Sequence, residues 1–92
     1  LEQIPKEFIL FQNYPNPFNP VTIIKFSVPT SSQVSVKVYD LLGREVATLI
    51  NEYKITGDHE VQFNASNLPS GLYIYRLSGQ NVNLTKKTML IK

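Results

Sequence analysis

The chain has 92 residues, no cysteine and a formal net charge of +2 at neutral pH. This length fits one domain with a single modest core. So small a charge, from scattered residues of both signs, excludes a nucleic-acid-binding footprint. The lack of cysteine excludes disulfides and cysteine-based metal sites. The longest apolar runs, of four or five residues, are too short to span a membrane or to form a secretory signal peptide.

Short segments of alternating apolar and polar residues recur along the chain with turn residues between them. This pattern is typical of an all-β sandwich or barrel. We expect six or seven strands, among them residues 22–28, 33–39, 44–50, 58–64, 72–78 and 84–91. Turns are predicted at residues 40–43 and 67–71, and a polar loop at residues 51–57. No ten-residue segment keeps a helical period without Gly, Pro or a β-branched run, so no helix of note is expected.

The alternation also predicts which side chains point into the core. The cleanest case is residues 33–39, where Val34, Val36 and Val38 face one way and Ser35, Lys37 and Tyr39 the other. The expected inward residues are Ile24, Phe26, Val28, Val34, Val36, Val38, His59, Val61, Phe63, Tyr73, Tyr75 and Leu77.

An unusual proline-asparagine segment precedes the first long strand. Its structural motif is Pro15, Asn16, Pro17, Phe18, Asn19 and Pro20. The prolines remove backbone donors and favour extended geometry at the residues before them, so the segment cannot be a central strand. We expect a stiff loop braced by asparagine side chains, with Phe18 closing one end of the sandwich. The alternative is a preformed extended segment that a partner recognises.

Two further motifs have structural interpretations. Asp40 and Gly43, followed by Arg44, predict a tight hairpin turn in which the glycine takes a positive φ. Tyr73, just after the turn Asn67 to Gly71, resembles the tyrosine corner of Ig-like sandwiches; a plain inward aromatic is the alternative.

No constellation of catalytic residues is visible. The single histidine, His59, lies in the middle of a predicted strand with no nucleophile motif beside it, so we interpret it as structural. Asp40 and Asp58 fall in turns, and Glu45 and Glu60 are most simply solvated strand residues. The carboxylates are not clustered as a calcium loop requires. We therefore expect no enzyme activity, no metal and no cofactor.

The closing strand carries Lys86, Lys87 and Lys92, with Arg76 expected on a neighbouring strand. On the bare sequence, such lysines are typical of protection against unwanted strand addition at a sheet edge.

Five motifs, in order, resemble the C-terminal sorting domain of type IX secretion substrates. They are Gln12 to Pro20 with Thr22-x-Ile24-x-Phe26, Val38-Tyr39-Asp40-x-x-Gly43-Arg44-x-Val46, Gly57-x-His59-x-Val61, Leu68-x-Ser70-Gly71-x-Tyr73, and Lys87-Thr88-Met89 to Lys92. Position 63 departs from the family pattern, because Phe63 stands where the family often has Trp.

The resemblance implies an Ig-like antiparallel β-sandwich of about seven strands. Residues 1–11 would be the end of a linker and an incoming strand, and residues 12–92 the sorting domain. Its implied function is to direct an upstream passenger from the periplasm through the outer-membrane translocon of a Gram-negative bacterium. A cell-surface peptidase would then remove it, with the passenger released or attached to the surface. The implied recognition residues are Gly71, Tyr73, Lys86, Lys87, Met89 and Lys92, so the lysines become contact residues rather than edge protection alone.

Two alternatives remain open at this stage. One is an accessory binding module for carbohydrate or adhesion, with exposed aromatics such as Tyr39 and Tyr53 as its site. The other is a structural domain similar to that of the flagellar hook-capping protein, which shares the Val38-Tyr39-Asp40 and Gly43-Arg44 signatures.

Overall fold

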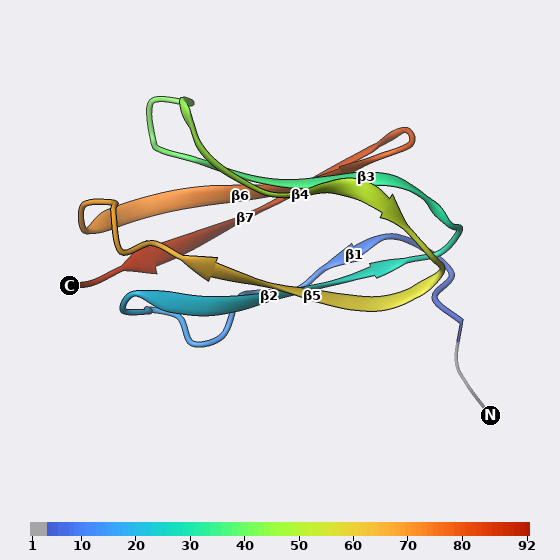
Figure 1. Ribbon diagram of the computed structural model, residues 1–92, viewed down its shortest axis with the longest axis horizontal. Helices are drawn as coiled ribbons and strands as arrows, with labels where there is room; N and C mark the ends of the chain where they lie inside the picture. Colours follow the sequence, from blue (N-terminus) through green and yellow to red (C-terminus); the bar gives the residue numbers. More distant parts are fainter. Residues whose placement is uncertain (1–3) are drawn as a thin grey trace.

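The computed structural model describes residues 4–92 as seven strands in two antiparallel sheets packed face to face (Figure 1). The strands are β1 (Ile9–Leu10), β2 (Val21–Val28), β3 (Ser32–Tyr39), β4 (Glu45–Lys54), β5 (Gly57–Asn64), β6 (Gly71–Gly79) and β7 (Val82–Leu90). Sheet A has the order β1-β2-β5, and sheet B the order β4-β3-β6-β7. The prediction of an all-β, seven-stranded sandwich is confirmed.

The core lies between the sheets and holds most of the side chains that the alternation predicts, but His59 and Val61 are only half-buried. Ile24, Phe26 and Val28 of β2 are fully buried, and so are Tyr75 and Leu77 of β6. Strand pairing keeps these residues on the inner faces because β2 pairs with β5, and β3 with β6, in an unbroken register. Each apolar residue therefore stays on one face along its whole strand.

Two strand boundaries differ from the prediction by more than one residue. The expected polar loop at residues 51–57 is wrong, because β4 continues to Lys54 and pairs with the start of β3. Asn51, Glu52 and Tyr53 are all exposed at the end of an edge strand, so neither face shows the apolar alternation that marks a strand. β7 also begins at Val82, two residues before the predicted start.

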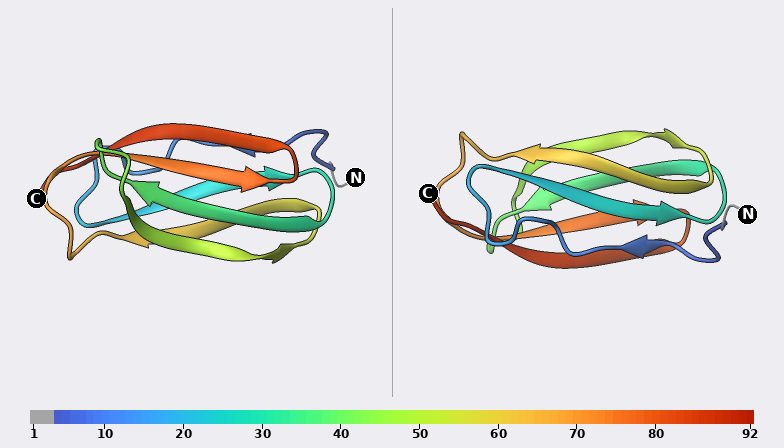
Figure 2. Two further views of the ribbon diagram at one scale, coloured as in Figure 1. Left: turned by 90° about the horizontal axis from the view of Figure 1, so that it is seen from above. Right: turned by 90° about the horizontal axis from the view of Figure 1, so that it is seen from below.

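The N-terminal segment crosses from one sheet to the other. β1 pairs with β2 in sheet A, whereas Phe18 forms a parallel bridge with Leu90 in sheet B. Viewed from below, β1 lies beside β7 along one side of the sandwich (Figure 2). The proline-asparagine segment therefore lies next to the last strand. None of residues 4–92 belongs to a helix that could span a membrane.

Candidate recognition surface

The β6–β7 hairpin carries the residues that the sequence analysis assigns to recognition. Gly71 and Tyr73 begin β6, and Lys86, Lys87 and Met89 lie in the second half of β7. The two strands pair from Gly71–Leu90 to Gly79–Val82, and Gln80 and Asn81 form the turn between them. Asn81 takes a positive φ of 58°, which asparagine tolerates in such turns.

The two adjacent lysines of β7, Lys86 and Lys87, lie on opposite faces of sheet B. Successive side chains of a strand point to opposite faces. Lys87 lies opposite Ile74 and points to the outer face of sheet B, whereas Lys86 lies opposite the buried Tyr75 on the inner side. Lys86 is nevertheless exposed, because β7 is the last strand of its sheet. A charged residue that points inward from an edge strand discourages pairing with strands that do not complement its charge.

The outer face of sheet B combines apolar and basic side chains. Leu72 lies opposite Met89, and Ile74 lies opposite Lys87, so these four side chains form one patch across β6 and β7. Leu72 is 38% exposed, and Ile74 and Met89 are half-buried. We call these four residues the β6–β7 patch. Leu72 and Ile74 are not among the predicted recognition residues, and only the strand register places them beside Lys87 and Met89.

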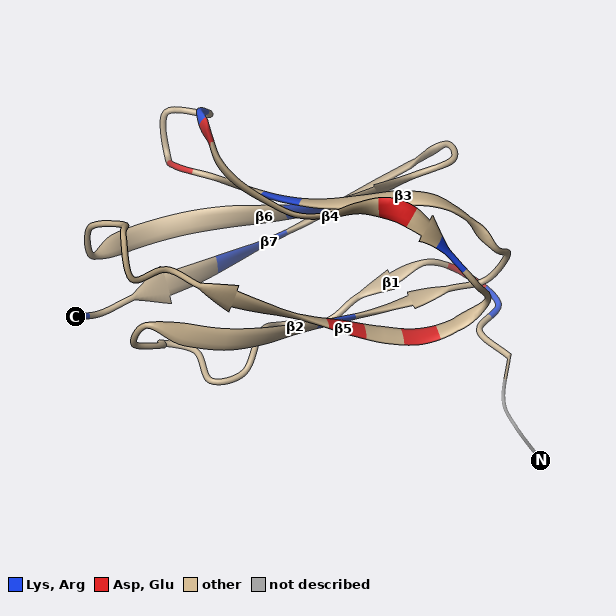
Figure 3. Ribbon diagram, in the orientation of Figure 1, with Lys and Arg blue, Asp and Glu red and all other residues tan. Residues whose placement is uncertain are grey.

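Two more cations lie beside the patch. Arg76 lies opposite Thr85 of β7 and Lys37 of β3, which confirms that it belongs to a strand next to the lysines. Its guanidinium carbon is 4.8 Å from the centre of the Tyr39 ring, and Lys37 forms a 3.4 Å ion pair with Glu45. Figure 3 shows Lys and Arg on β7 and the adjoining part of sheet B, and Asp and Glu on β5 of sheet A and also on β4 of sheet B.

Tyr73 lies in the core beneath the β6–β7 patch and fixes the turn that precedes β6. Its side chain is buried, and its hydroxyl donates a 2.6 Å hydrogen bond to the carbonyl of Pro69. This is the geometry of a tyrosine corner, so that prediction is confirmed. Burial raises the pKa of the Tyr73 hydroxyl, with a smaller contribution from Asp40. Gly71 has a φ of 152°, a conformation that side chains disfavour.

The last residue is tied back to the preceding turn. The backbone N–H of Lys92 donates to the hydroxyl of Ser70 at 3.0 Å, and its ammonium donates to the carbonyl of Ser66 at 2.7 Å. Ile91, which precedes it, is 52% exposed. The structure therefore separates Lys92 from the β6–β7 patch and places it at the end of the sandwich.

The proline-asparagine segment holds the second half of β7. Phe18 is only 2% exposed, and its ring lies 5.6 Å from that of Phe63. The side-chain oxygen of Asn16 accepts from the backbone N–H of Met89 at 3.1 Å and from the hydroxyl of Thr88 at 3.3 Å. The predicted loop braced by an asparagine, with Phe18 buried in the core, is confirmed. Pro15, Pro17 and Asn19 are exposed.

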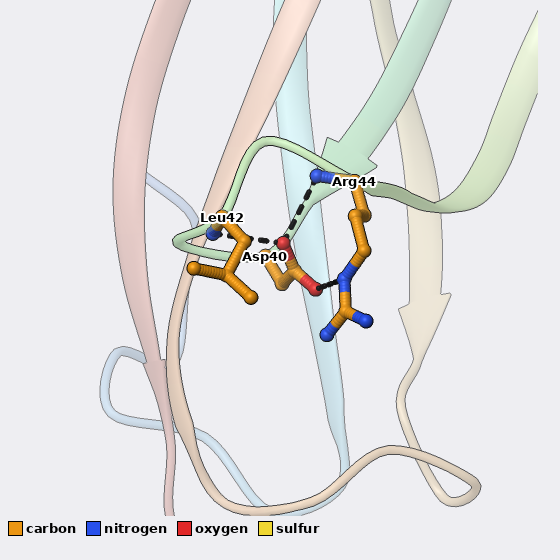
Figure 4. Close-up of polar contacts among 3 residues, drawn as sticks. All are labelled: Asp40, Leu42 and Arg44. Carbon is orange, nitrogen blue, oxygen red and sulfur yellow. Dashed lines mark hydrogen bonds and ion pairs between the residues drawn. The ribbon is translucent and has the colours of Figure 1, made fainter.

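The Asp40–Arg44 turn is structural as well (Figure 4). One carboxylate oxygen of Asp40 accepts from the backbone N–H groups of Leu42 and Arg44, and the other accepts from the Arg44 side chain at 2.7 Å. The hydrogen bond from the Arg44 backbone is the main reason that the pKa of Asp40 is lowered. Gly43 has a φ of 84°, which confirms the predicted turn. Both carboxylate oxygens are therefore engaged in bonds within the turn.

The structure offers no catalytic or metal arrangement within residues 4–92. No three His, Cys, Asp or Glu side chains of this part come together as metal ligands. His59 stacks on Phe26 with the ring centres 5.5 Å apart, and its Nε2 bonds the carbonyl of Ile55. Asp58 accepts a hydrogen bond from Ser27. The contacts of His59 match its structural interpretation, whereas Asp58 lies in β5, opposite Ser27, and not in the predicted turn.

The two tyrosines of the binding-module alternative do not form a row. Tyr39 lies under Arg76, whereas Tyr53 pairs with Gln33 at the other end of β3. Gln33 and Tyr39 are six positions apart along the strand, a distance of about 20 Å. A shallow hollow of about 310 Å³ lies on sheet A, lined by Phe11, Lys25 and Glu60 among others, and it contains none of the predicted site residues.

Comparison with known proteins agrees with the motif order. The model of the secretion system C-terminal sorting domain family matches residues 12–92. A search of curated proteins found no match. The family match covers every strand from β2 to β7 and both motifs that pack together, the proline-asparagine segment and the closing strand. The chain therefore belongs to the secretion system C-terminal sorting domain family, the sorting signals of type IX secretion.

Proposed function

We propose that the domain directs a passenger through the type IX outer-membrane translocon by docking through the β6–β7 patch, without any chemistry of its own. The family is non-catalytic and implies export to the cell surface or the extracellular space. The observation that carries the proposal is the pairing of Lys87 and Met89 with Ile74 and Leu72 on one exposed face. Apolar side chains beside a cation suit a partner with an apolar, acidic surface.

Gly71, Tyr73 and Lys92 contribute to this docking indirectly. The buried Tyr73 and the Gly71 backbone fix the start of β6, which carries Leu72 and Ile74. Lys92 fixes the end of the chain through Ser66 and Ser70. Their loss would displace the patch rather than remove a contact. Lys86, at the edge of β7, is the second cation that a partner meets.

We extend to this chain the export and processing that the family assignment implies. The passenger lies upstream in the same precursor and crosses the periplasm of a Gram-negative bacterium before the domain meets the translocon. A surface peptidase then removes the domain, and the passenger is released or attached to the cell surface. The hook-capping alternative is less favoured, because it shares only the Val38-Tyr39-Asp40 and Gly43-Arg44 signatures, whereas the family match covers residues 12–92.

The test is export of a fluorescent reporter fused ahead of the domain, in a host with a working type IX system. Deletion of Lys87 to Lys92 would also remove Leu90, which is fully buried, so loss of export would not separate misfolding from lost recognition. The sharper variant is Lys87→Glu with Met89→Glu, which changes only the patch.

The matched control is Lys6→Glu, an exposed lysine outside both sheets. We expect the intact fusion and the control to reach the medium or the cell surface, and the patch variant to stay in the periplasm with an unchanged melting temperature. Equal export of the patch variant and the control would refute docking through the patch. No export of the intact fusion would refute the sorting function for this chain.

A further inference from the structure

The outer edge of β7 has two stretches that differ in how their backbone groups are bonded. In an antiparallel pair, alternate residues direct both backbone groups to the partner strand, and the residues between them direct theirs away from it. The N–H and C=O of Met89 both bond outside the β6–β7 ladder. Counting back by twos, Lys87, Thr85 and Asn83 also present their backbone groups to the outer edge.

The second stretch of this edge is occupied by residues 12–18, which we call the strap. The side chain of Gln12 donates to the carbonyl of Lys87 at 2.7 Å. Asn16 accepts from the N–H of Met89, and the N–H of Phe18 donates to the carbonyl of Met89 at 3.0 Å. The N–H of Ile91 donates to the carbonyl of Phe18 at 3.0 Å. A partner strand therefore cannot pair with β7 beyond Lys87 while the strap is in place.

Bonds that do not involve β7 fix the strap. Tyr14 exchanges two backbone hydrogen bonds with Ile23 of β2. The hydroxyl of Tyr75 accepts from the N–H of Asn13 at 2.8 Å and donates to the carbonyl of Phe11 at 2.7 Å. At the other end, Phe18 is buried. With anchors at both ends, the strap is held beside β7 by contacts that do not depend on the outer edge of that strand alone.

The first stretch of the edge has no such cover. Within residues 4–92, no backbone hydrogen bond joins Asn83 or Thr85 to a segment outside the hairpin. β1 packs beside β7 but uses its own backbone to pair with β2. Asn83, Thr85 and Lys86 are exposed. The unpaired N–H and C=O groups of an edge strand are the template to which an extended peptide adds.

We propose that β7 accepts a short extended segment of the type IX machinery by strand addition at Asn83, Thr85 and the N–H of Lys87, and that the strap sets where this pairing ends. The inference rests on the proposed sorting function and names the edge through which the same hairpin is bound. The added strand would lie beside the cationic side chains of Lys86 and Lys87, so the partner segment is acidic. Its paired length is limited to about five residues, Asn83 to Lys87.

A proline at Thr85 tests the pairing. Thr85→Pro removes an outward N–H that the hairpin itself does not use, and edge strands tolerate proline at such positions. Thr85→Val keeps the N–H and removes the hydroxyl. Tyr53→Pro removes an outward N–H from β4, at the other edge of the same sheet. All three are placed in the reporter fusion, and the isolated domains are checked by thermal unfolding.

We expect Thr85→Pro to lower the exported fraction at least tenfold, with a melting temperature close to that of Tyr53→Pro, while Thr85→Val and Tyr53→Pro are exported like the parent. Normal export of a folded Thr85→Pro domain would overturn the proposal and leave the sorting function intact. Failure of Thr85→Val would also overturn it, because recognition would then depend on the side chain. If thermal unfolding shows that Thr85→Pro does not fold, Lys86→Glu decides: a severalfold loss of export supports the acidic partner strand, and parental export refutes it.

Discussion

The two edges of sheet B are protected in different ways. β4, at one edge, pairs with β3 through register shifts at Val36/Lys37 and Val38/Tyr39, and it carries an ion pair between Glu52 and Lys54. Irregular pairing and charge are devices that a strand carries in its own sequence. β7, at the other edge, is covered over its second half by the strap, about 70 positions away in the chain. The edge strand with the proposed recognition residues is thus the one that a distant segment partly covers.

Removal of the buried anchor of the strap is expected to have the largest effect. Phe18→Ala should lower the free energy of unfolding by about 3–5 kcal/mol, because it leaves a cavity beside Phe63 and Leu90. Chemical denaturation measures this loss. The matched variant Phe11→Ala, at a side chain that is 45% exposed, should lose far less. Equal losses would mean that Phe18 does not anchor the strap.

The second effect in size concerns Tyr75, which joins the strap to sheet B. Tyr75→Phe removes two hydrogen bonds of the hydroxyl, the one it donates to the carbonyl of Phe11 and the one it accepts from the N–H of Asn13. We therefore expect a loss of about 2–3 kcal/mol in the free energy of unfolding.

The same tyrosine predicts a pH dependence. Burial raises its pKa from 10.0 to about 12, opposed in part by the hydrogen bond from Asn13. The unfolded chain loses this proton near pH 10 and the folded domain near pH 12. The stabilisation is therefore complete below pH 10 and is lost as the pH rises to about 12. The stability difference between the parent and Tyr75→Phe should shrink over this range; a constant difference would contradict the assignment.

A smaller effect is expected at the tyrosine corner, where the Tyr73 hydroxyl bonds Pro69 and not the strap. Tyr73→Phe removes the hydrogen bond to Pro69 and should cost about 1–2 kcal/mol. Thermal unfolding checks this value against Tyr53→Phe, at a side chain that is 62% exposed. An unchanged melting temperature for Tyr73→Phe would show that the hydrogen bond to Pro69 does not stabilise the domain.

The smallest effect is expected at Asn16, and it compares the covered and the uncovered stretch of β7. Asn16→Ala should cost about 1 kcal/mol and accelerate amide hydrogen exchange at Met89, whose N–H loses its acceptor. In the parent, the amides of Asn83 and Thr85 should already exchange rapidly. Asn19→Ala, in the same segment and exposed, should leave every one of these rates unchanged. Protection of Thr85 equal to that of Met89 would show that the edge of β7 is uniform.

Much of the fold could be predicted because strand faces follow from local alternation. The inward residues of β2, β3 and β6 all lie in the core, and the Asp40–Gly43 turn has its predicted conformation. The end of β4 was missed because Asn51 to Tyr53 face water on both sides, so no alternation marks them as a strand. Local patterns identify a strand only where one of its faces is buried.

The candidate site was only partly predictable. Its named residues and their order along the chain come from the sequence, and they resemble a family that the match over residues 12–92 confirms. The sequence could not separate Lys86 from Lys87, which point to opposite faces, or join Leu72 to Met89. Such relations depend on register, and one residue of slip would reverse every face.

The sequence by itself therefore determined the all-β class, the core faces, the turns and the family of sorting domains. Only the tertiary structure decided that the proline-asparagine segment lies along β7, where it covers Lys87 to Ile91 and leaves Asn83 and Thr85 open. The physical reason is the range of the interactions. Alternation and turn chemistry act over a few residues, whereas the bonds between the strap and β7 join groups more than 70 positions apart.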